Sequence, residues 1–473
     1  MSLRARCTDR DFLRRLVGLA APISIQQLVT SSLFHLVNAI LLSHLGEAAL
    51  GAVSLVGRMG GIASLVLGGI AGGVSMFCAQ LGARSDRGDR GNHSARGDRD
   101  DIARVLGAGL LVTSAFTLPL ALAAALAPGA VLHLLSSDPG VIEAGSAYLP
   151  LLALQYPLLA VILVFSAAAR SLGRPRLPLV TAGIGAAVST LLSYGLVLGR
   201  LGLPALGVHG AGVAALLSRL LEAALLVGAL YLGPRTTPRA VPLPALPFRD
   251  GTLSRFLAPT WPLVLNELLW ALGTFAYVAI YARMGTGPLA AIGVLTPIQW
   301  VCIDVFVGLG SAAGILLGQE LGAGNEARAY DLAVRISIVG PAFAALGGVV
   351  IAFASGLLLA PFSGVGPAAL GGARTMLFMF AATLWIQVST MISCLGVMRA
   401  GGDTRFMLLF NTGGTWLLGL PLACAAFALG LPIEAVFACT LVEEFLKMLL
   451  WTHRLRSRRW MRDLGAAPLP SRP

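Results

Sequence analysis

Long hydrophobic segments, separated by short polar stretches, follow one another along almost the whole chain. A helix needs roughly 20 mostly apolar residues to cross a bilayer, and many of these segments reach that length. Most contain Gly or Pro, which bundles of membrane helices tolerate. The pattern therefore predicts an all-α polytopic membrane protein with twelve spans, at residues 16–44, 48–80, 102–127, 142–169, 177–199, 208–232, 256–282, 287–317, 330–360, 375–398, 406–428 and 433–452.

The second half of the chain repeats the first at a nearly constant spacing. "AQLGA" at 79–83 and "GQELGAG" at 318–324 share a Leu-Gly-Ala that recurs after 240 residues, and "RSLGRPR" at 170–176 matches "RAGGDTR" at 399–405 after 229 residues. The spacing shortens because the first half carries an insertion at 84–101, whose Arg, Asp and Gly are typical of a solvated loop.

Each half holds six predicted spans, so both halves insert in the same orientation. We expect two six-helix bundles related by a pseudo-two-fold axis along the membrane normal, an arrangement that many secondary transporters use for alternating access. The sequence divides accordingly into an N-terminal lobe at 1–232, a linker at 233–254 and a C-terminal lobe at 255–473 with a basic tail.

Composition places most of the chain in lipid. The 473 residues are 56% hydrophobic and 12% charged, against about 25% charged residues in a typical soluble domain. The net charge of +12 does not indicate nucleic acid, because the arginines cluster in alternate loops, as the positive-inside rule predicts. The opposite loops contain only Arg200, Arg283 and Arg374. We expect a multi-pass protein of the inner (plasma) membrane with both termini in the cytoplasm.

Several motifs resemble the multidrug and toxic compound extrusion (MATE) family, and they keep its order over nearly the whole chain. They are "LVNAILLSHLGEAALGAVSLV" at 36–56, "GVHGAGVAALLSRLLE" at 207–222, "NELLW" at 266–270, "GQELGAGNEARAYDLA" at 318–333 and "MRAGGDTRFMLLFN" at 398–411. The resemblance implies twelve helices in two lobes. It also implies export of bulky, often cationic organic compounds, driven by inward movement of H⁺ or Na⁺ and without a cofactor.

Glu267 is an acid inside a long apolar segment. An ionised acid at the bilayer centre costs about 2.5–3.5 kcal/mol on insertion scales, so such residues usually face a cavity or a partner. With Asn266, Trp270 and Tyr277 on the same predicted helix, Glu267 could hold a cationic compound or exchange it for a coupling ion. The alternative is a structural acid hydrogen-bonded between helices. Asp304, in the next span, is a second candidate, or else an acid near a helix end that faces water.

The resemblance also implies ion-binding positions in the first and eleventh spans, where family members often carry aspartate. This sequence has Asn38 and Asn411 there. An asparagine can bind an ion through its carbonyl oxygen but cannot titrate, so we expect coupling to run mainly through the C-terminal half. Asn38 could equally hold helices together through polar contacts.

Two further sets of charged residues in the spans come in groups at helical spacing, whereas Arg58 has no obvious partner in the sequence. Arg219 and Glu222 are three residues apart, and Lys447 follows Glu443 and Glu444 by four and three residues. Residues at this spacing lie on one helix face. We interpret both groups as structural ion pairs, with a role in lobe movement as the alternative.

Other functional classes find little support in the sequence. A Walker motif needs a lysine before Ser or Thr, but the single lysine, Lys447, precedes Met448. HExxH, GxSxG and CxxC motifs are absent, so we expect neither an enzyme nor a metal site, Na⁺ apart. A flippase for lipids or lipid-linked oligosaccharides remains the alternative, although away from their ends the predicted spans hold only Arg58, Arg219 and Lys447 to bind phosphates.

Overall fold

A computed structural model describes residues 10–33, 47–87, 93–133, 139–232, 241–246, 251–362, 364–462 and 464. Within these ranges the chain forms helices joined by turns and short loops, and no strand occurs there. The contacts divide the chain into two compact units. The first unit lies within Ile25–Thr260, and the second unit combines residues of Trp261–Ala467 with the helical residues up to Ser24.

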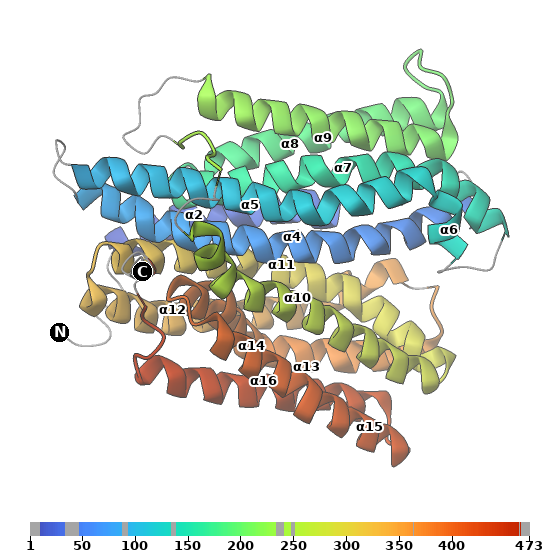
Figure 1. Ribbon diagram of the computed structural model, residues 1–473. Coiled ribbons are helices and arrows are strands. Elements are labelled where there is room, and N and C mark those ends of the chain that lie inside the picture. Colours follow the sequence, from blue (N-terminus) through green and yellow to red (C-terminus); the bar gives the residue numbers. More distant parts are fainter. Residues whose placement is uncertain are drawn as a thin grey trace. The chain divides into compact units, whose positions relative to one another are not determined.

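The first unit is a bundle of long helices (Figure 1). Helix α7 packs against α4, α5 and α9, and α8 packs alongside α9. A π-helical segment, η1, continues α2 and contacts α8. The elements are η1 (Leu28–Leu33), α4 (Glu47–Arg87), α5 (His93–Leu126), the short α6 (Pro128–His133), α7 (Pro139–Ser171), α8 (Arg176–Leu198) and α9 (Gly207–Tyr231).

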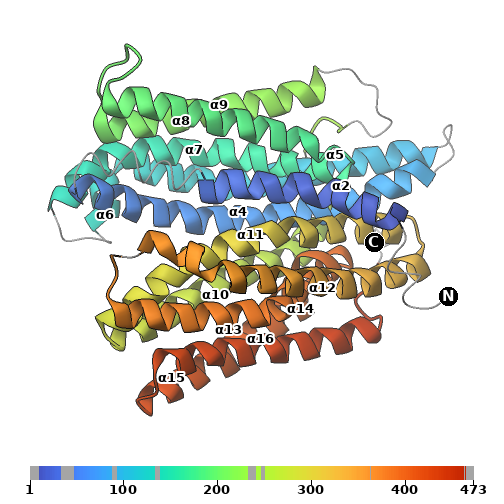
Figure 2. The same cartoon turned by 180° about the vertical axis from the view of Figure 1, so that it is seen from behind.

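The second unit is also a helical bundle, in which α13 lies between α12 and α16 (Figure 2). Two of its spans change from α-helix to π-helix along their length. The elements are α2 (Arg10–Gln27), α10 (Thr252–Arg283), α11 (Thr286–Gly322), α12 (Glu326–Leu359), the 3₁₀ turn η2 (Ala360–Phe362), α13 (Pro367–Ile392), η3 (Ser393–Met398), α14 (Thr404–Gly413), η4 (Gly414–Gly419), α15 (Leu420–Ala428) and α16 (Ile433–Arg456).

The predicted spans agree with these helices to within several residues. Ten helices in the described part of the chain are long and apolar enough to cross a membrane, which confirms the all-α polytopic fold. The predicted span 16–44 is described only to residue 33. The last predicted span, 433–452, is α16, which carries Glu443, Glu444 and Lys447 near its middle.

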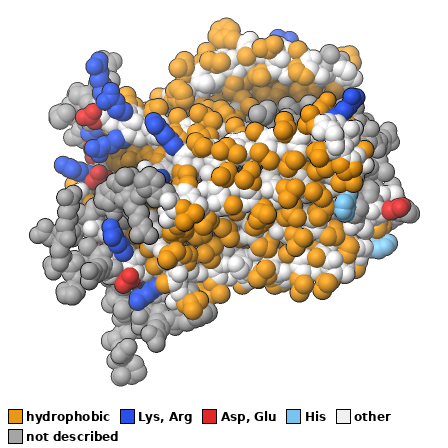
Figure 3. Space-filling view, turned by 90° about the horizontal axis from the view of Figure 1, so that it is seen from above, with side chains coloured by type: hydrophobic (Ala, Val, Ile, Leu, Met, Phe, Trp, Pro, Cys, Tyr) orange, Lys and Arg blue, Asp and Glu red, His pale blue; other side chains and the backbone are white. Residues whose placement is uncertain are grey.

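The surface of the helices explains why lipid is needed as solvent. Large hydrophobic side chains are exposed on α8 and α9, among them Val180, Leu191 and Leu220. Hydrophobic side chains cover most of the face seen in Figure 3, and Lys and Arg side chains gather at one end of it. This separation of apolar flank from basic end is what a helix bundle in a bilayer requires.

Glycines allow the closest helix contacts and one sharp helix end. A Cβ atom at Gly348 on α12 would overlap the carbonyl oxygen of Ala381 on α13, so these helices approach backbone to backbone. Helix α8 ends at Gly199, whose φ of 66° is left-handed and whose N–H donates to the Gly195 carbonyl.

The start of α2 packs within the second unit. Ser24 Oγ donates to the Val305 carbonyl at 2.6 Å, and the Arg335 guanidinium lies 5.9 Å from the Phe12 ring centroid. The compact units therefore separate within α2 and α10, whereas the sequence repeat places its lobes at 1–232 and 255–473. Those lobe boundaries stay a prediction.

Candidate functional site

Two groups of polar side chains lie between the packed helices of the second unit. The first, called the α10 cluster, comprises Asn266 and Glu267 of α10, Arg399 after η3 and Asn411 of α14. The second, called the α16 cluster, is centred on α16 and comprises Tyr277, Thr415, Glu443, Glu444 and Lys447. Both groups join residues far apart in the sequence across neighbouring helices.

The central contact of the α10 cluster is an ion pair between Arg399 and Glu267. Arg399 Nη2 donates to Glu267 Oε1 at 3.4 Å, which is longer than the roughly 2.7–2.9 Å of a strong charge-assisted hydrogen bond. The Glu267 side chain is 20% exposed. This carboxylate is therefore held loosely by its cation and is partly accessible.

The amides of the α10 cluster form a second contact beside this ion pair. Asn411 Nδ2 donates to Asn266 Oδ1 at 2.8 Å, and both side chains are buried. Because Asn266 directly precedes Glu267, this hydrogen bond fixes α14 against α10 next to the acid. The structure thus brings together Asn266 and Asn411, which the sequence indicates as separate candidates for the binding site.

Glu443, at the centre of the α16 cluster, is bound far more tightly. Its carboxylate accepts hydrogen bonds from Tyr277 Oη at 2.6 Å and from Thr415 Oγ1, and it contacts the Lys447 ammonium. Lys447 Nζ also lies 3.1 Å from Glu444 Oε1. Glu443 and Lys447 are both almost fully buried. Three donors around one buried carboxylate leave little room for exchange, because a departing partner would leave an unpaired charge buried in the protein.

Aromatic side chains flank the α10 cluster. The Trp270 and Trp300 rings meet edge to face with centroids 5.7 Å apart, which brings α10 against α11. The Trp416 indole N–H donates to the Leu269 carbonyl at 3.2 Å. Asp304 lies on α11 and is 3% exposed, so it is a buried acid and not one facing water near a helix end. Asn38 lies outside the described residues.

Sequence reasoning missed Arg399 and Thr415. Arg399 lies between the predicted spans 375–398 and 406–428, and nothing local connects it with Glu267, which is 132 residues away. A signal was present in the repeat, because Arg399 matches Arg170 across the 229-residue spacing. Thr415 carries no sequence signal of its own.

The first unit contains the counterpart of the Arg399 contact. Arg170 Nη1 donates to Gln26 Oε1 at 3.2 Å. The 240-residue spacing of the repeat matches Gln26 and Gln27 of α2 to Asn266 and Glu267 of α10. Each half thus brings an arginine to its own first helix, but only the second half supplies an acid there.

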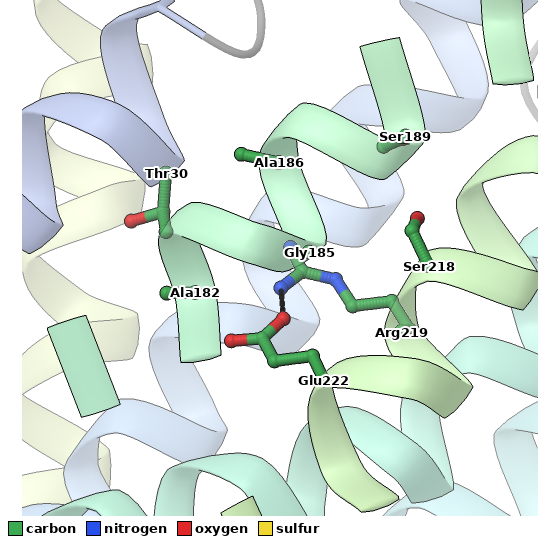
Figure 4. A pocket seen from close by; sticks show the side chains of 8 residues that line it. All are labelled: Thr30, Ala182, Gly185, Ala186, Ser189, Ser218, Arg219 and Glu222. Carbon is green, nitrogen blue, oxygen red and sulfur yellow. Dashed lines mark hydrogen bonds and ion pairs between the residues drawn. The ribbon is translucent and has the colours of Figure 1, made fainter. Parts of the chain in front are cut away.

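A small pocket of the first unit is lined by Thr30, Ala182, Gly185, Ala186, Ser189, Ser218, Arg219 and Glu222 (Figure 4). Arg219 Nη1 lies 2.7 Å from Glu222 Oε2, and the Glu222 side chain is buried. Ser189 Oγ is buried and has no hydrogen-bond partner among the described residues. The ion pair occupies the polar side of this pocket, and its structural role stays a prediction.

In the described ranges, no group of three or more His, Cys, Asp or Glu side chains is arranged to hold a metal ion. The polar chemistry found there consists of carboxylates, amides, hydroxyls and paired cations. Such groups can bind and release small cations, protons or hydrogen-bonding organic molecules.

Comparison with known families identifies the architecture around these clusters. The sequence model of the MatE family matches residues 22–194 and 262–425. The comparison with curated protein sequences finds no match.

Solved structures of similar fold cover almost the whole chain. A crystal structure of a MATE in complex with MaL6 has a TM-score of 0.81 at 17% identity, covering 97% of this chain and 100% of that chain. An outward-facing multidrug resistance MATE family transporter of the MOP superfamily has a TM-score of 0.81 at 18% identity, covering 96% and 99%. A MOP superfamily transporter from Pyrococcus furiosus, described as having a binding pocket of reverse polarity, has a TM-score of 0.79 at 17% identity, covering 97% and 99%.

Proposed function

Because this chain belongs to the MatE family of membrane transporters, we propose that it exports bulky organic compounds, often cations, in exchange for inward-moving H⁺ or Na⁺. Glu267 is the residue at which the two cargoes compete. The proposal needs no cofactor beyond the coupling cation. Its other partners are the organic substrate and the surrounding lipid.

The observation that supports this proposal best is the contrast between the partly exposed Glu267 and the buried Glu443. Glu267 has one long ion pair with Arg399 and remains partly exposed, whereas Glu443 is enclosed by Tyr277, Thr415 and Lys447. A carboxylate can exchange partners only if losing the first partner costs little. Glu267 meets this condition and Glu443 does not.

Competition at Glu267 gives a simple exchange cycle. In the empty transporter, Arg399 neutralises the carboxylate. An organic cation displaces Arg399, and the carboxylate with the nearby Trp270 indole binds the cation through charge and the aromatic face. Arrival of H⁺ or Na⁺ on the opposite side neutralises Glu267 and releases the substrate. Neither cargo binds while the other is present, which is the requirement for antiport.

The neighbouring residues have supporting roles. Asn266 and Asn411 hold α10 and α14 together and offer amide oxygens to a cation. Asp304 contributes a second negative charge from α11. The matched position in the first half is Gln27, and Asn38 cannot titrate, so the charge that drives exchange lies in the second half.

The distribution of arginines supports an orientation for the protein. They cluster in alternate loops and in both terminal segments, and the cytoplasmic loops of inner-membrane proteins carry such an excess. We place both termini in the cytoplasm, so that export runs from the arginine-rich, cytoplasmic side of the membrane to the opposite side.

Ethidium efflux from energised membrane vesicles tests the proposal. Wild type, Glu267→Gln and Glu326→Gln are compared under a proton gradient and then under a sodium gradient. Glu326 is an exposed acid at the start of α12, so its replacement controls for the chemical change. We expect loss of efflux in Glu267→Gln alone, and the gradient that drives wild type identifies the coupling ion.

Two results would refute the proposal. Glu267→Gln could transport as well as wild type, which would make the acid structural. Wild type could instead move no organic cation under either gradient, in which case a lipid or oligosaccharide flippase would be the better account.

A further inference from the structure

The chain beyond α16 folds back onto the turn that carries Arg399. This segment, called the tail clamp, comprises residues 457–462 and Leu464. Its Trp460 side chain is completely buried. A Cβ atom at Gly401 would overlap the Trp460 carbonyl oxygen, and one at Gly402 would meet the Leu464 side chain. The tail clamp therefore packs closely on Gly401 and Gly402 of this turn.

Asp403 is the polar centre of this contact. Its carboxylate accepts from Arg454 Nε at 2.7 Å and from Arg462 Nη2 at 3.0 Å. Asp403 is 1% exposed, so its charge is out of water and compensated by two arginines. Arg462 belongs to the tail clamp, and Arg454 lies in the last turn of α16.

Two cation–π contacts strengthen the attachment. The Arg454 guanidinium lies 4.7 Å from the Phe406 ring centroid, directly after the turn. The Arg458 guanidinium lies 4.2 Å from the Tyr330 ring centroid on α12. Such contacts are attractive because the face of an aromatic ring carries partial negative charge. The tail clamp thus binds α12 through Arg458, while Arg454 of α16 binds the start of α14.

Backbone hydrogen bonds in the turn at 398–403 connect Asp403 with Arg399. The Asp403 N–H donates to the Met398 carbonyl at 3.0 Å, and the Gly402 N–H donates to the Arg399 carbonyl at 3.1 Å. Gly402 has a φ of 69°, the left-handed conformation that glycine adopts without strain. These bonds make residues 398–403 one closed unit. Fixing Asp403 therefore fixes the backbone from which the Arg399 side chain reaches Glu267.

We propose that the tail clamp positions Arg399 for exchange at Glu267, with Asp403 and Arg462 as positioning residues. This inference rests on the proposed function of Glu267. The ion pair between Arg399 Nη2 and Glu267 Oε1 is long, at 3.4 Å. The placement of the Arg399 backbone therefore decides how readily the guanidinium returns to the carboxylate. A loosened clamp lets Arg399 drift away, so the return of the empty transporter to the state in which Arg399 neutralises Glu267 slows, and the efflux rate falls with it.

A double-mutant cycle on the full-length protein separates positioning from general stabilisation. Ethidium efflux is measured in proteoliposomes for Arg462→Gln, Arg399→Gln and the variant with both changes, at equal amounts of inserted protein. Arg459→Gln is the matched control. Arg459 is exposed, and its side chain makes no hydrogen bond or ion pair within the part of the chain that the structure describes.

If Arg462 acts through Arg399, its replacement lowers the efflux rate about fivefold, the change given by a side-chain coupling of about 1 kcal/mol. The same replacement then has no further effect in the Arg399→Gln background. Arg462→Lys restores most of the rate, because an ammonium can still reach Asp403. Arg459→Gln transports as wild type does.

The inference is overturned if the losses from Arg462→Gln and Arg399→Gln multiply, or if Arg462→Gln behaves like Arg459→Gln. Should Asp403→Asn fail to insert, the Arg462 variants still decide the question, because Arg462 is half exposed at the surface. Glu267→Gln distinguishes the two proposals. An inactive Glu267→Gln with multiplying losses refutes only the tail clamp, whereas an active Glu267→Gln refutes the proposed function and the inference together.

Discussion

At the scale of residues, the second unit has two glutamates within its helices that differ in burial and in partners. Glu443 is enclosed by a hydroxyl from α10, a hydroxyl from η4 and an ammonium from its own helix. The Glu267 carboxylate has one ion pair, with the Arg399 guanidinium at 3.4 Å. Removing one partner from a buried ion pair is costly, while a partly exposed pair contributes little to stability. The same residue type is thus structural at one position and suited to exchange at the other.

Replacing Glu443 should therefore damage the fold. Glu443→Gln leaves Lys447 with Glu444 alone and weakens the bonds from Tyr277 and Thr415, so we expect a loss of about 3–5 kcal/mol, the cost of breaking a buried pair. Thermal unfolding in detergent, followed by fluorescence-detected size exclusion, measures this against Glu326→Gln. Equal unfolding temperatures for the two variants would show that the α16 cluster is not a structural element.

Replacing Glu267 should leave stability nearly unchanged. The Arg399–Glu267 pair is long and a fifth of the Glu267 side chain is exposed, so solvent screening reduces its contribution to less than about 1 kcal/mol. In the same unfolding assay, Glu267→Gln is expected to stay close to wild type. A drop as large as that of Glu443→Gln would contradict the distinction between the two acids.

At the scale of elements, packing depends on how closely backbones approach. Helices α12 and α13 meet where Gly348 faces the Ala381 carbonyl, and a Cβ atom at Gly348 would overlap that oxygen. Elsewhere the helices widen into π-helix, at η3 before Arg399 and at η4, which carries Thr415. Single π-helical turns within α-helices occur frequently at functional sites, and here they flank both polar clusters.

Two glycines of α12 test the importance of this close approach. Gly348→Ala places a methyl group against the Ala381 carbonyl and should destabilise the protein by about 1–3 kcal/mol, as overpacking does. A Cβ atom at Gly356 would meet nothing within 4 Å, so Gly356→Ala is the control within the same helix. If both variants unfold at the same temperature, α12 and α13 are not in backbone contact.

At the scale of the whole molecule, the sequence predicted the spans and missed the contacts between them. Spans are predictable because lipid fixes both the length and the polarity of a crossing helix. The spacing of Lys447 from Glu443 and Glu444 also predicted local contacts, since neighbours on a helix face are set by its periodicity. Arg399 and Glu267, or Tyr277 and Glu443, meet only through packing of distant segments, which no local pattern encodes.

The orientation in the membrane can be tested with a single cysteine. In a variant whose six cysteines are replaced, Ser471→Cys marks the C-terminus for a membrane-impermeant maleimide. The arginine distribution predicts labelling in inside-out vesicles and none in intact spheroplasts. The reverse pattern would place the termini outside and invert the direction of transport.

The most direct test of the account asks whether substrate and coupling ion share the Glu267 carboxylate. Ethidium bound to purified protein is followed by fluorescence polarisation while H⁺ or Na⁺ is added, in wild type and in Glu267→Gln. The account predicts that one of these ions displaces ethidium from wild type, and that Glu267→Gln binds ethidium weakly and without response to that ion. Equal affinity and equal displacement in both proteins would contradict it.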